Sequence, residues 1–138
     1  MKGDISYPAS LRHSERYPDD YAALERVSGK GVPVVSVLFS GRPVYANDLI
    51  NMSDAFIAAW LPGTEGQGIT DILFRGANGR MAKDFQGRLP FDWPGASCPE
   101  TAKKPVLFAR GYGLKLAKKS NLGRLPEDGV ETCPPLAE

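Results

Sequence analysis

The side chains best suited to chemistry in this sequence follow two apolar runs. Ser40 and Arg42 lie in a Ser-Gly-Arg-Pro turn after the first run, and Glu65 lies in a Pro-Gly-Thr-Glu turn after the second. A hydroxyl, a guanidinium and a carboxylate can hold a polar ligand, although arginine at such a turn often braces neighbouring carbonyl groups instead. Glu65 is a poor general acid, because the positive end of a helix dipole stabilises its charged form. We therefore expect these three residues to contact a substrate or a partner domain, with no catalytic residue assigned.

The elements that must position these side chains are two strands. Residues 33–40 are almost continuously apolar and mostly β-branched or aromatic, which is typical of a strand covered on both faces in a parallel sheet. Residues 54–61 form the second run, which Pro62 and Gly63 end. The alternative for this run is one broken helix, because Phe56, Ile57 and Trp60 also suit a helical face. If both strands are parallel, their turns share one edge of the sheet, where ligands bind.

Helices are predicted beside these strands. Residues 19–28 read as a helix that begins after Pro18 and ends at Gly29. A second helix follows Gly63, with capping-box spacing between Thr64 and Gln67 and one apolar face. That face comprises Ile69, Ile72 and Leu73, and we expect it to pack back on the sheet. Gly66 and Gly68 at its start indicate close packing or room for a ligand.

The remaining segments have weaker patterns. Residues 44–53 read as a connection, with room for a short extended piece at residues 43–46 and a turn at Asn47-Asp48, and residues 88–93 read as a short edge strand interrupted by Pro90. Residues 106–108 and 112–116 are short apolar pieces that can dock on the domain. Residues 1–18 read as an irregular leader of a larger domain, and residues 117–138 as a tail or linker, disordered or extended from Pro126. The predicted fold class is α/β, an open and mostly parallel sheet flanked by helices with a long irregular C-terminal tail.

Composition argues against several classes of function. The chain has 138 residues and a net charge of +1, so no global charge bias favours nucleic acid, although seven basic residues lie between Lys103 and Arg124. No apolar run approaches the roughly 18 residues that span a bilayer. His13 is the sole histidine, expected to be exposed in a loop, and the two cysteines lack CxxC spacing, so we predict no metal site and no cofactor. A Cys98–Cys133 disulfide and two free thiols both remain open.

Four segments in order resemble one family. These are VVSVLFSGRPVY (34–45), SDAFIAAWLPGTEGQGITDILF (53–74), GRLPFDWP (87–94) and LFARGYGL (107–114). They resemble the second, α/β-sandwich domain of family 3 glycoside hydrolases, in the branch of exo-acting β-glucosidases and glucan β-glucosidases. The resemblance implies a partial flavodoxin-like sandwich over residues 19–116.

The resemblance also implies a two-domain parent enzyme. In this family a barrel domain precedes the sandwich, the sugar lies between them, and two carboxyl groups give hydrolysis with retention. The nucleophile is a barrel aspartate, and the proton donor is a glutamate shortly before a loop that Gly3-Asp4-Ile5 resembles, which places it upstream of Met1. Members are often periplasmic or secreted, but this chain shows no targeting signal of its own.

The function predicted from the resemblance is therefore that of a fragment. We expect the C-terminal part of a β-glucosidase or exo-β-glucanase that acts on β-glucosides or β-glucan oligosaccharides with a barrel partner, without nucleic acid or membrane. On its own the chain is expected to be inactive, because both catalytic carboxyls lie outside it. The alternatives are a non-catalytic module that binds sugar or docks on the barrel, and a complete small α/β protein with its own ligand.

Overall fold

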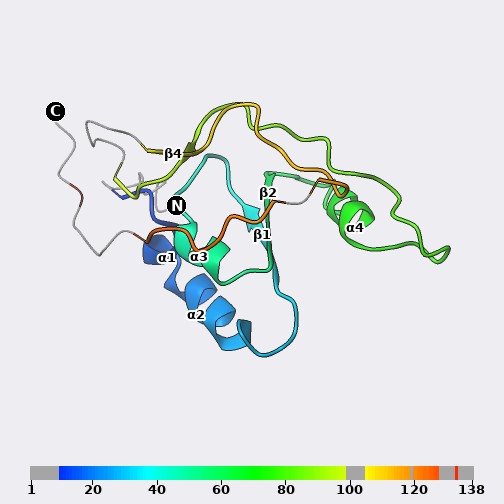
Figure 1. The fold of residues 1–138 in the computed structure, drawn as a ribbon, viewed down its shortest axis with the longest axis horizontal. Helices are drawn as coiled ribbons and strands as arrows, with labels where there is room; N and C mark the ends of the chain where they lie inside the picture. The colour runs from blue at the N-terminus through cyan, green and yellow to red at the C-terminus, as the bar shows by residue number, and fades with distance from the viewer. Residues whose placement is uncertain (1–9, 99–104, 119, 128–132, 134–138) are drawn as a thin grey trace.

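The computed structural model describes residues 10–98, 105–118, 120–127 and 133. Helices and short strands alternate through its first half, and long loops dominate the second half (Figure 1). In chain order the elements are α1 (His13–Arg16), α2 (Pro18–Val27), β1 (Val35–Phe39), α3 (Asn47–Asn51), β2 (Ala55–Trp60), α4 (Gln67–Leu73), β3 (Trp93–Pro94) and β4 (Val106–Phe108).

The two predicted strands pair in parallel. Val35 pairs with Ala55 and the register continues to Leu38 with Ala58, after which a bulge moves Phe39 opposite Trp60. The parallel pair confirms the strand prediction and excludes the broken helix. Only these two parallel strands occur within the part of the chain that the structure describes, which supports a partial α/β fold.

The hydrophobic core lies against one face of this sheet. Its buried members are Leu38, Val44, Ala46, Leu49 and Trp93. The connection predicted over residues 44–53 includes an unpredicted helix, α3, whereas the short extended piece predicted at residues 43–46 agrees with the parallel bridge at Tyr45; Val44, Tyr45 and Ala46 are fully buried and lead directly into α3. The expected turn at Asn47-Asp48 is the first turn of α3, since the buried apolar residues on both sides favour a helix packed on the core.

The N-terminal region contains more structure than predicted. Arg12 forms a parallel bridge with Tyr45, and α1 follows it, so residues 12–16 are not irregular. His13 is only 6% exposed, and its Nε2 lies 3.0 Å from Asp20 Oδ2. The expectation of an exposed histidine is therefore wrong, because α2 places a carboxylate opposite the ring. The helix predicted over residues 19–28 is confirmed as α2, one residue earlier at each end.

Helix α4 begins later than the capping-box spacing predicts. Gly66 is its N-cap and no side chain caps it, while Thr64 lies in a turn that the Glu65 N–H closes on the Pro62 carbonyl at 3.0 Å. Gly63 has a φ of 57°, which turns the chain before the helix can start. Ile69, Ile72 and Leu73 form the half-buried face.

The two glycines at the start of α4 do not serve close packing within the described residues. A Cβ added to Gly66 or to Gly68 would meet nothing within 4 Å. None of the residues of α4 is buried, so the expected packing of this helix on the sheet is incomplete in this chain.

The second half of the chain pairs with itself. β3 and β4 form an antiparallel pair, so the apolar piece predicted at residues 106–108 is a strand, whereas the edge strand predicted at residues 88–93 is reduced to Trp93. Before β3, Leu89 donates its N–H to the Tyr112 carbonyl and accepts from the Gly111 N–H. Pro90 lacks an N–H, which explains why a longer strand does not form there.

The C-terminal segment contacts the core. Leu125 is 8% exposed, and Pro126 accepts hydrogen bonds from Tyr45 and Asn47, so the alternative of disorder is wrong for residues 126 and 127. Cys98 and Cys133 form a disulfide, which resolves the alternative that the sequence leaves open. The remainder of the predicted tail beyond Glu127, apart from Cys133, lies outside the described residues.

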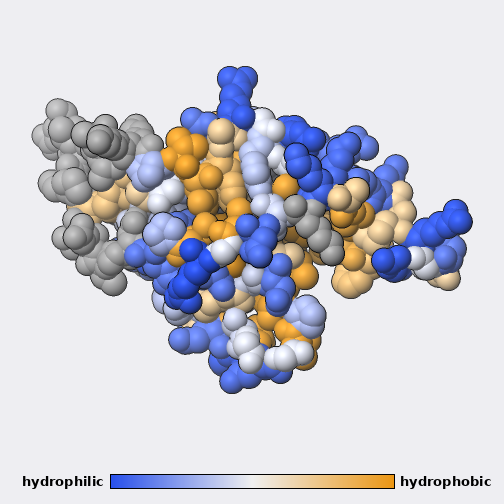
Figure 2. Space-filling view, viewed as in Figure 1, coloured by the Kyte–Doolittle hydropathy of each residue, from blue (hydrophilic) through white to orange (hydrophobic). Residues whose placement is uncertain are grey.

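Hydrophobic side chains also reach the surface. Figure 2 shows them in the middle of the molecule and again over α4. Among the described residues no helix combines the length and the hydropathy that crossing a membrane requires.

Candidate functional site

The candidate site lies where β1 and β2 end. The turn of residues 40–43 follows β1 and the turn of residues 61–65 follows β2, and because the strands are parallel both turns leave the same edge. A Cβ on Gly41 would lie 3.3 Å from Cδ1 of Leu61, which places the two turns in contact. We call these two turns the rim. The structure thus brings Ser40, Arg42 and Glu65 to one edge of the sheet, as the parallel arrangement predicts.

Ser40 stabilises its own turn. Its hydroxyl donates to the Arg42 carbonyl at 2.6 Å and accepts from the Arg42 N–H at 3.3 Å, while its N–H donates to the Trp60 carbonyl at 3.1 Å. The last bond extends the parallel pairing one residue beyond β1. The Ser40 side chain therefore fixes the shape of the rim, and Arg42, which is exposed, is the residue of this turn with the longer reach.

Glu65 is the exposed carboxylate of the rim. Its Oε1 lies 3.4 Å from the Thr64 hydroxyl, and its backbone closes the turn after β2. An exposed carboxylate remains accessible to a ligand or to a cationic side chain of a partner.

Trp60 connects β2 to the second turn in an unusual conformation. Its φ is 55°, and among the described residues it is the non-glycine residue with a positive φ. Its ring packs edge-on against Phe91, with the ring centroids 5.3 Å apart, and lies near Trp93, with the centroids 5.9 Å apart. A bulky residue in this region carries backbone strain, and such strain is concentrated at functional sites and turns. These aromatic contacts place Trp60 among the half-buried residues that pack against the core.

Two large apolar residues on the rim side are exposed. Phe39 at the end of β1 is 56% exposed, and Leu61 at the start of the second turn is 71% exposed. Sequence reasoning assigned both to buried strands, because a continuous apolar run does not reveal which of its residues are exposed in the folded chain. Phe39 points away from the core because it follows the buried Leu38 and successive side chains of a strand point to opposite faces, whereas the bulge places its extra residue, Ala59, on β2.

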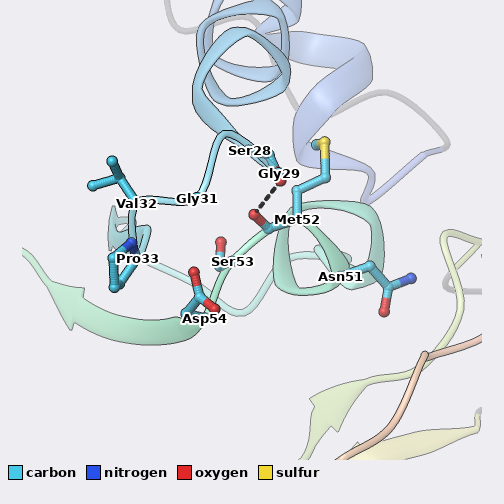
Figure 3. A pocket seen from close by; sticks show the side chains of 9 residues that line it. All are labelled: Ser28, Gly29, Gly31, Val32, Pro33, Asn51, Met52, Ser53 and Asp54. Carbon is cyan, nitrogen blue, oxygen red and sulfur yellow. Dashed lines mark hydrogen bonds between the residues drawn. The ribbon is translucent and has the colours of Figure 1, made fainter.

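A hollow lies at the opposite edge of the sheet. It has a volume of about 400 Å³ and is lined by residues before β1 and β2, including Ser28, Pro33, Asn51 and Asp54 (Figure 3). Its polar groups already have partners, since Ser28 donates to the Met52 carbonyl at 2.8 Å and Asp54 accepts from the Val34 N–H at 2.7 Å. This hollow is a junction between elements, and the rim remains the candidate site.

The side chains of the rim are of types that bind ligands or protein surfaces. It offers a guanidinium, one exposed carboxylate and exposed apolar side chains, whereas hydrolysis with retention needs a pair of carboxyl groups. Within the described ranges, no three of the His, Cys, Asp and Glu side chains gather as metal ligands would. The segment Gly3-Asp4-Ile5, which resembles the loop after the family's proton donor, lies outside the described residues, as do Lys103, Lys104 and Lys119 of the basic run.

Comparisons with known proteins agree with this geometry. Residues 10–116 match the model of the glycosyl hydrolase family 3 C-terminal domain. The chain is 34% identical over 92 residues to a lysosomal beta glucosidase of Dictyostelium discoideum, covering 65% of this chain and 10% of that protein. It is 32% identical over 92 residues to a periplasmic beta-glucosidase of Salmonella typhimurium, covering 65% of this chain and 11% of that protein.

A solved structure is also similar. The crystal structure of an exo-1,3/1,4-beta-glucanase from a Pseudoalteromonas species matches with a TM-score of 0.81 and 37% identity, covering 94% of this chain and 16% of that chain. The chain thus spans about a tenth of the length of the curated relatives that it matches. The family model covers well over half of the chain, and the chain therefore belongs to the glycoside hydrolase family 3 C-terminal domain family.

Proposed function

We propose that this chain is the C-terminal domain portion of a retaining β-glucosidase or exo-β-glucanase. Its rim faces a β-glucoside or β-glucan oligosaccharide bound between this domain and a barrel domain. The observation that carries the proposal is the parallel pairing of β1 and β2, because it directs both turns to one edge. The family match and the named relatives support the substrate class.

In this proposal Arg42 and Glu65 contact the sugar or the barrel. Both residues are exposed, and a guanidinium and a carboxylate can each hydrogen-bond sugar hydroxyl groups. Ser40 supports them indirectly, because its hydroxyl bonds within the turn that presents Arg42. Trp60 anchors the second turn through its contacts with Phe91 and Trp93.

The chain on its own does not hydrolyse glycosides in this proposal. A retaining reaction requires a nucleophile and an acid/base, with carboxyl groups about 5–5.5 Å apart. The rim turns contribute one carboxylate, Glu65, and no residue of this chain matches the family's motif for either catalytic role.

Assay with an aryl β-glucoside tests this point. We expect the purified chain to release the aryl alcohol at the rate of the buffer alone, and the Glu65→Gln variant to behave identically. Turnover by the chain that Glu65→Gln abolishes would overturn the proposal, because it would make Glu65 a catalytic group.

A non-catalytic docking module is the second candidate. The exposed Phe39 and Leu61 favour it, because apolar side chains on a rim suit a protein surface better than a hydroxyl-rich ligand alone. Titration with glucose or a β-glucan oligosaccharide separates the two functions. Shifts of rim amides indicate sugar binding, and their absence leaves docking as the role of this edge.

A further inference from the structure

Residues 124–127 lie across α3, and we call this segment the strap. Asn51 holds the backbone of Leu125 in both directions: the Leu125 N–H donates to Asn51 Oδ1 at 2.8 Å, and Asn51 Nδ2 donates to the Leu125 carbonyl at 2.9 Å. A side-chain amide used in this way substitutes for a neighbouring strand. The recognition is of main-chain groups, so it fixes the position of the segment along α3.

Further contacts extend along the strap. The Pro126 carbonyl accepts from Asn47 Nδ2 at 2.9 Å and from the Tyr45 hydroxyl at 3.3 Å. Glu127 Oε1 accepts from Asn51 Nδ2 at 2.7 Å and from Arg124 Nη2 at 2.9 Å. Only Leu125 buries its side chain, at 8% exposure, while residues 124, 126 and 127 are exposed.

The strap is thus held by a few hydrogen bonds and one buried leucine. Each such hydrogen bond contributes little net free energy on its own, because the released groups can bond to water. Cys133 lies after the strap and forms a disulfide with Cys98, which adjoins the buried Ser97. The Ser97 carbonyl accepts from the Leu11 N–H at 2.6 Å, so the disulfide attaches the strap to a fixed part of the domain.

We propose that the strap is a redox-controlled clasp: the Cys98–Cys133 disulfide keeps residues 124–127 on Asn47 and Asn51, and its reduction releases them. With the bond closed, the strap remains at a high effective concentration beside α3. With the bond open, this advantage is lost and the individually weak contacts dissociate more often. The inference does not depend on the proposed function.

The chemical step is a thiol–disulfide exchange. A dithiol such as dithiothreitol attacks one sulfur of the disulfide as a thiolate, forms a mixed disulfide and then closes into its own cyclic disulfide. Two electrons and two protons pass to the protein, so Cys98 and Cys133 become thiols while the reagent is oxidised.

Release of the strap removes hydrogen bonds from residues that lie close to the first rim turn. The Tyr45 hydroxyl and the Asn47 amide lose an acceptor when Pro126 leaves. Val44 and Tyr45 are fully buried and follow directly after the rim turn of residues 40–43. The clasp therefore supports the segment on which the first rim turn is built.

Amide hydrogen exchange on the full chain tests the proposal. With dithiothreitol we expect exchange at the Leu125 amide to rise about tenfold or more, because local opening governs exchange of such an amide. The Cys98→Ser, Cys133→Ser double variant should behave in the same way without reductant. Asn51→Ala should release the strap in the oxidised chain, whereas Asn78→Ala, which alters an exposed asparagine in a local turn, should not.

The amides of β1 and β2 serve as the control for folding. Their exchange should stay unchanged within about twofold while that of Leu125 rises, because strap release is a local event. Unchanged exchange at Leu125 after reduction would overturn the clasp. An equal rise in the strap and in the sheet would also overturn it, because the disulfide would then stabilise the whole domain instead of the strap.

Discussion

The strap side of α3 and the rim differ in how completely other residues of the chain cover them. At the strap, Asn47, Asn51 and Tyr45 all have hydrogen-bond partners from residues 125–127, and Leu125 closes over the core. At the rim, Arg42 and Glu65 are exposed, and so are the apolar side chains of Phe39 and Leu61. The strap thus covers its side of α3, whereas these four side chains of the rim region are exposed.

This difference indicates where recognition occurs. The strap buries Leu125 and bonds to Tyr45, Asn47 and Asn51, although the buried Asn47 Oδ1 has no hydrogen-bond partner. Exposed apolar side chains beside exposed charged groups, as at the rim, are typical of an interaction site. We therefore propose that the strap side acts as the support and that the rim acts as the recognition surface. Substitutions at the strap side and at the rim should separate into effects on stability and effects on binding.

The largest effect is expected from Tyr45→Ala. Tyr45 is fully buried and bonds to Pro126, so its removal leaves a cavity and should lower the free energy of unfolding by about 3–5 kcal/mol. Chemical denaturation monitored by circular dichroism measures this change. Leu61→Ala on the rim is the matched control and should change stability by less than about 0.5 kcal/mol. Equal losses for the two variants would remove the distinction between support and rim.

Asp48→Ala should have the next largest effect. Asp48 is 4% exposed, it accepts from the Ser14 hydroxyl, and its Oδ2 lies 3.6 Å from Arg12 Nη1. Removing this carboxylate takes a counter-ion away from a mostly buried guanidinium, so we expect a loss of about 2–3 kcal/mol in denaturation experiments. Asp71→Ala, on exposed α4, should be nearly neutral. A neutral Asp48→Ala would show that α1 and α3 are not joined through this group.

Ser40→Ala should have the smallest effect on stability. The variant loses one hydrogen bond within an exposed turn, which corresponds to about 0.5–1 kcal/mol in the same denaturation experiment. Because the hydroxyl shapes the turn that presents Arg42, binding of a β-glucan oligosaccharide should weaken more than stability falls. A stability loss as large as that of Asp48→Ala would place Ser40 with the support instead.

Periodicity and turn chemistry predicted the elements with strong local signals. The runs at residues 33–40 and 54–61 were β-branched or ended by Pro-Gly, and both are strands in the expected parallel arrangement. Asn47-Asp48 is a common turn pair, but the buried residues around it made it the start of a helix. Thr64 had the spacing of a cap, yet the positive φ of Gly63 placed it in a separate turn.

Contacts between segments far apart in the chain could not be predicted from the sequence. His13 is buried because α2 brings Asp20 opposite its ring, and Pro126 is ordered because α3 presents two asparagines to the strap. Each contact depends on the folded positions of both segments, and neither segment has a local pattern that encodes it. The position of the two rim turns at one edge of the sheet was predictable, because the carboxyl ends of parallel strands lie at the same edge; the contact of their side chains with a ligand stays a prediction. The conformation of Trp60 followed no such rule.

Amide chemical shifts during titration of the full chain with a β-glucan oligosaccharide test the central claim most directly. The account predicts shifts at Arg42 and Glu65 and their neighbours in the two turns, with amides of residues 124–127 unchanged. Shifts confined to the strap, or equal shifts at the strap and the rim, would contradict the assignment of the rim as the surface that meets the sugar.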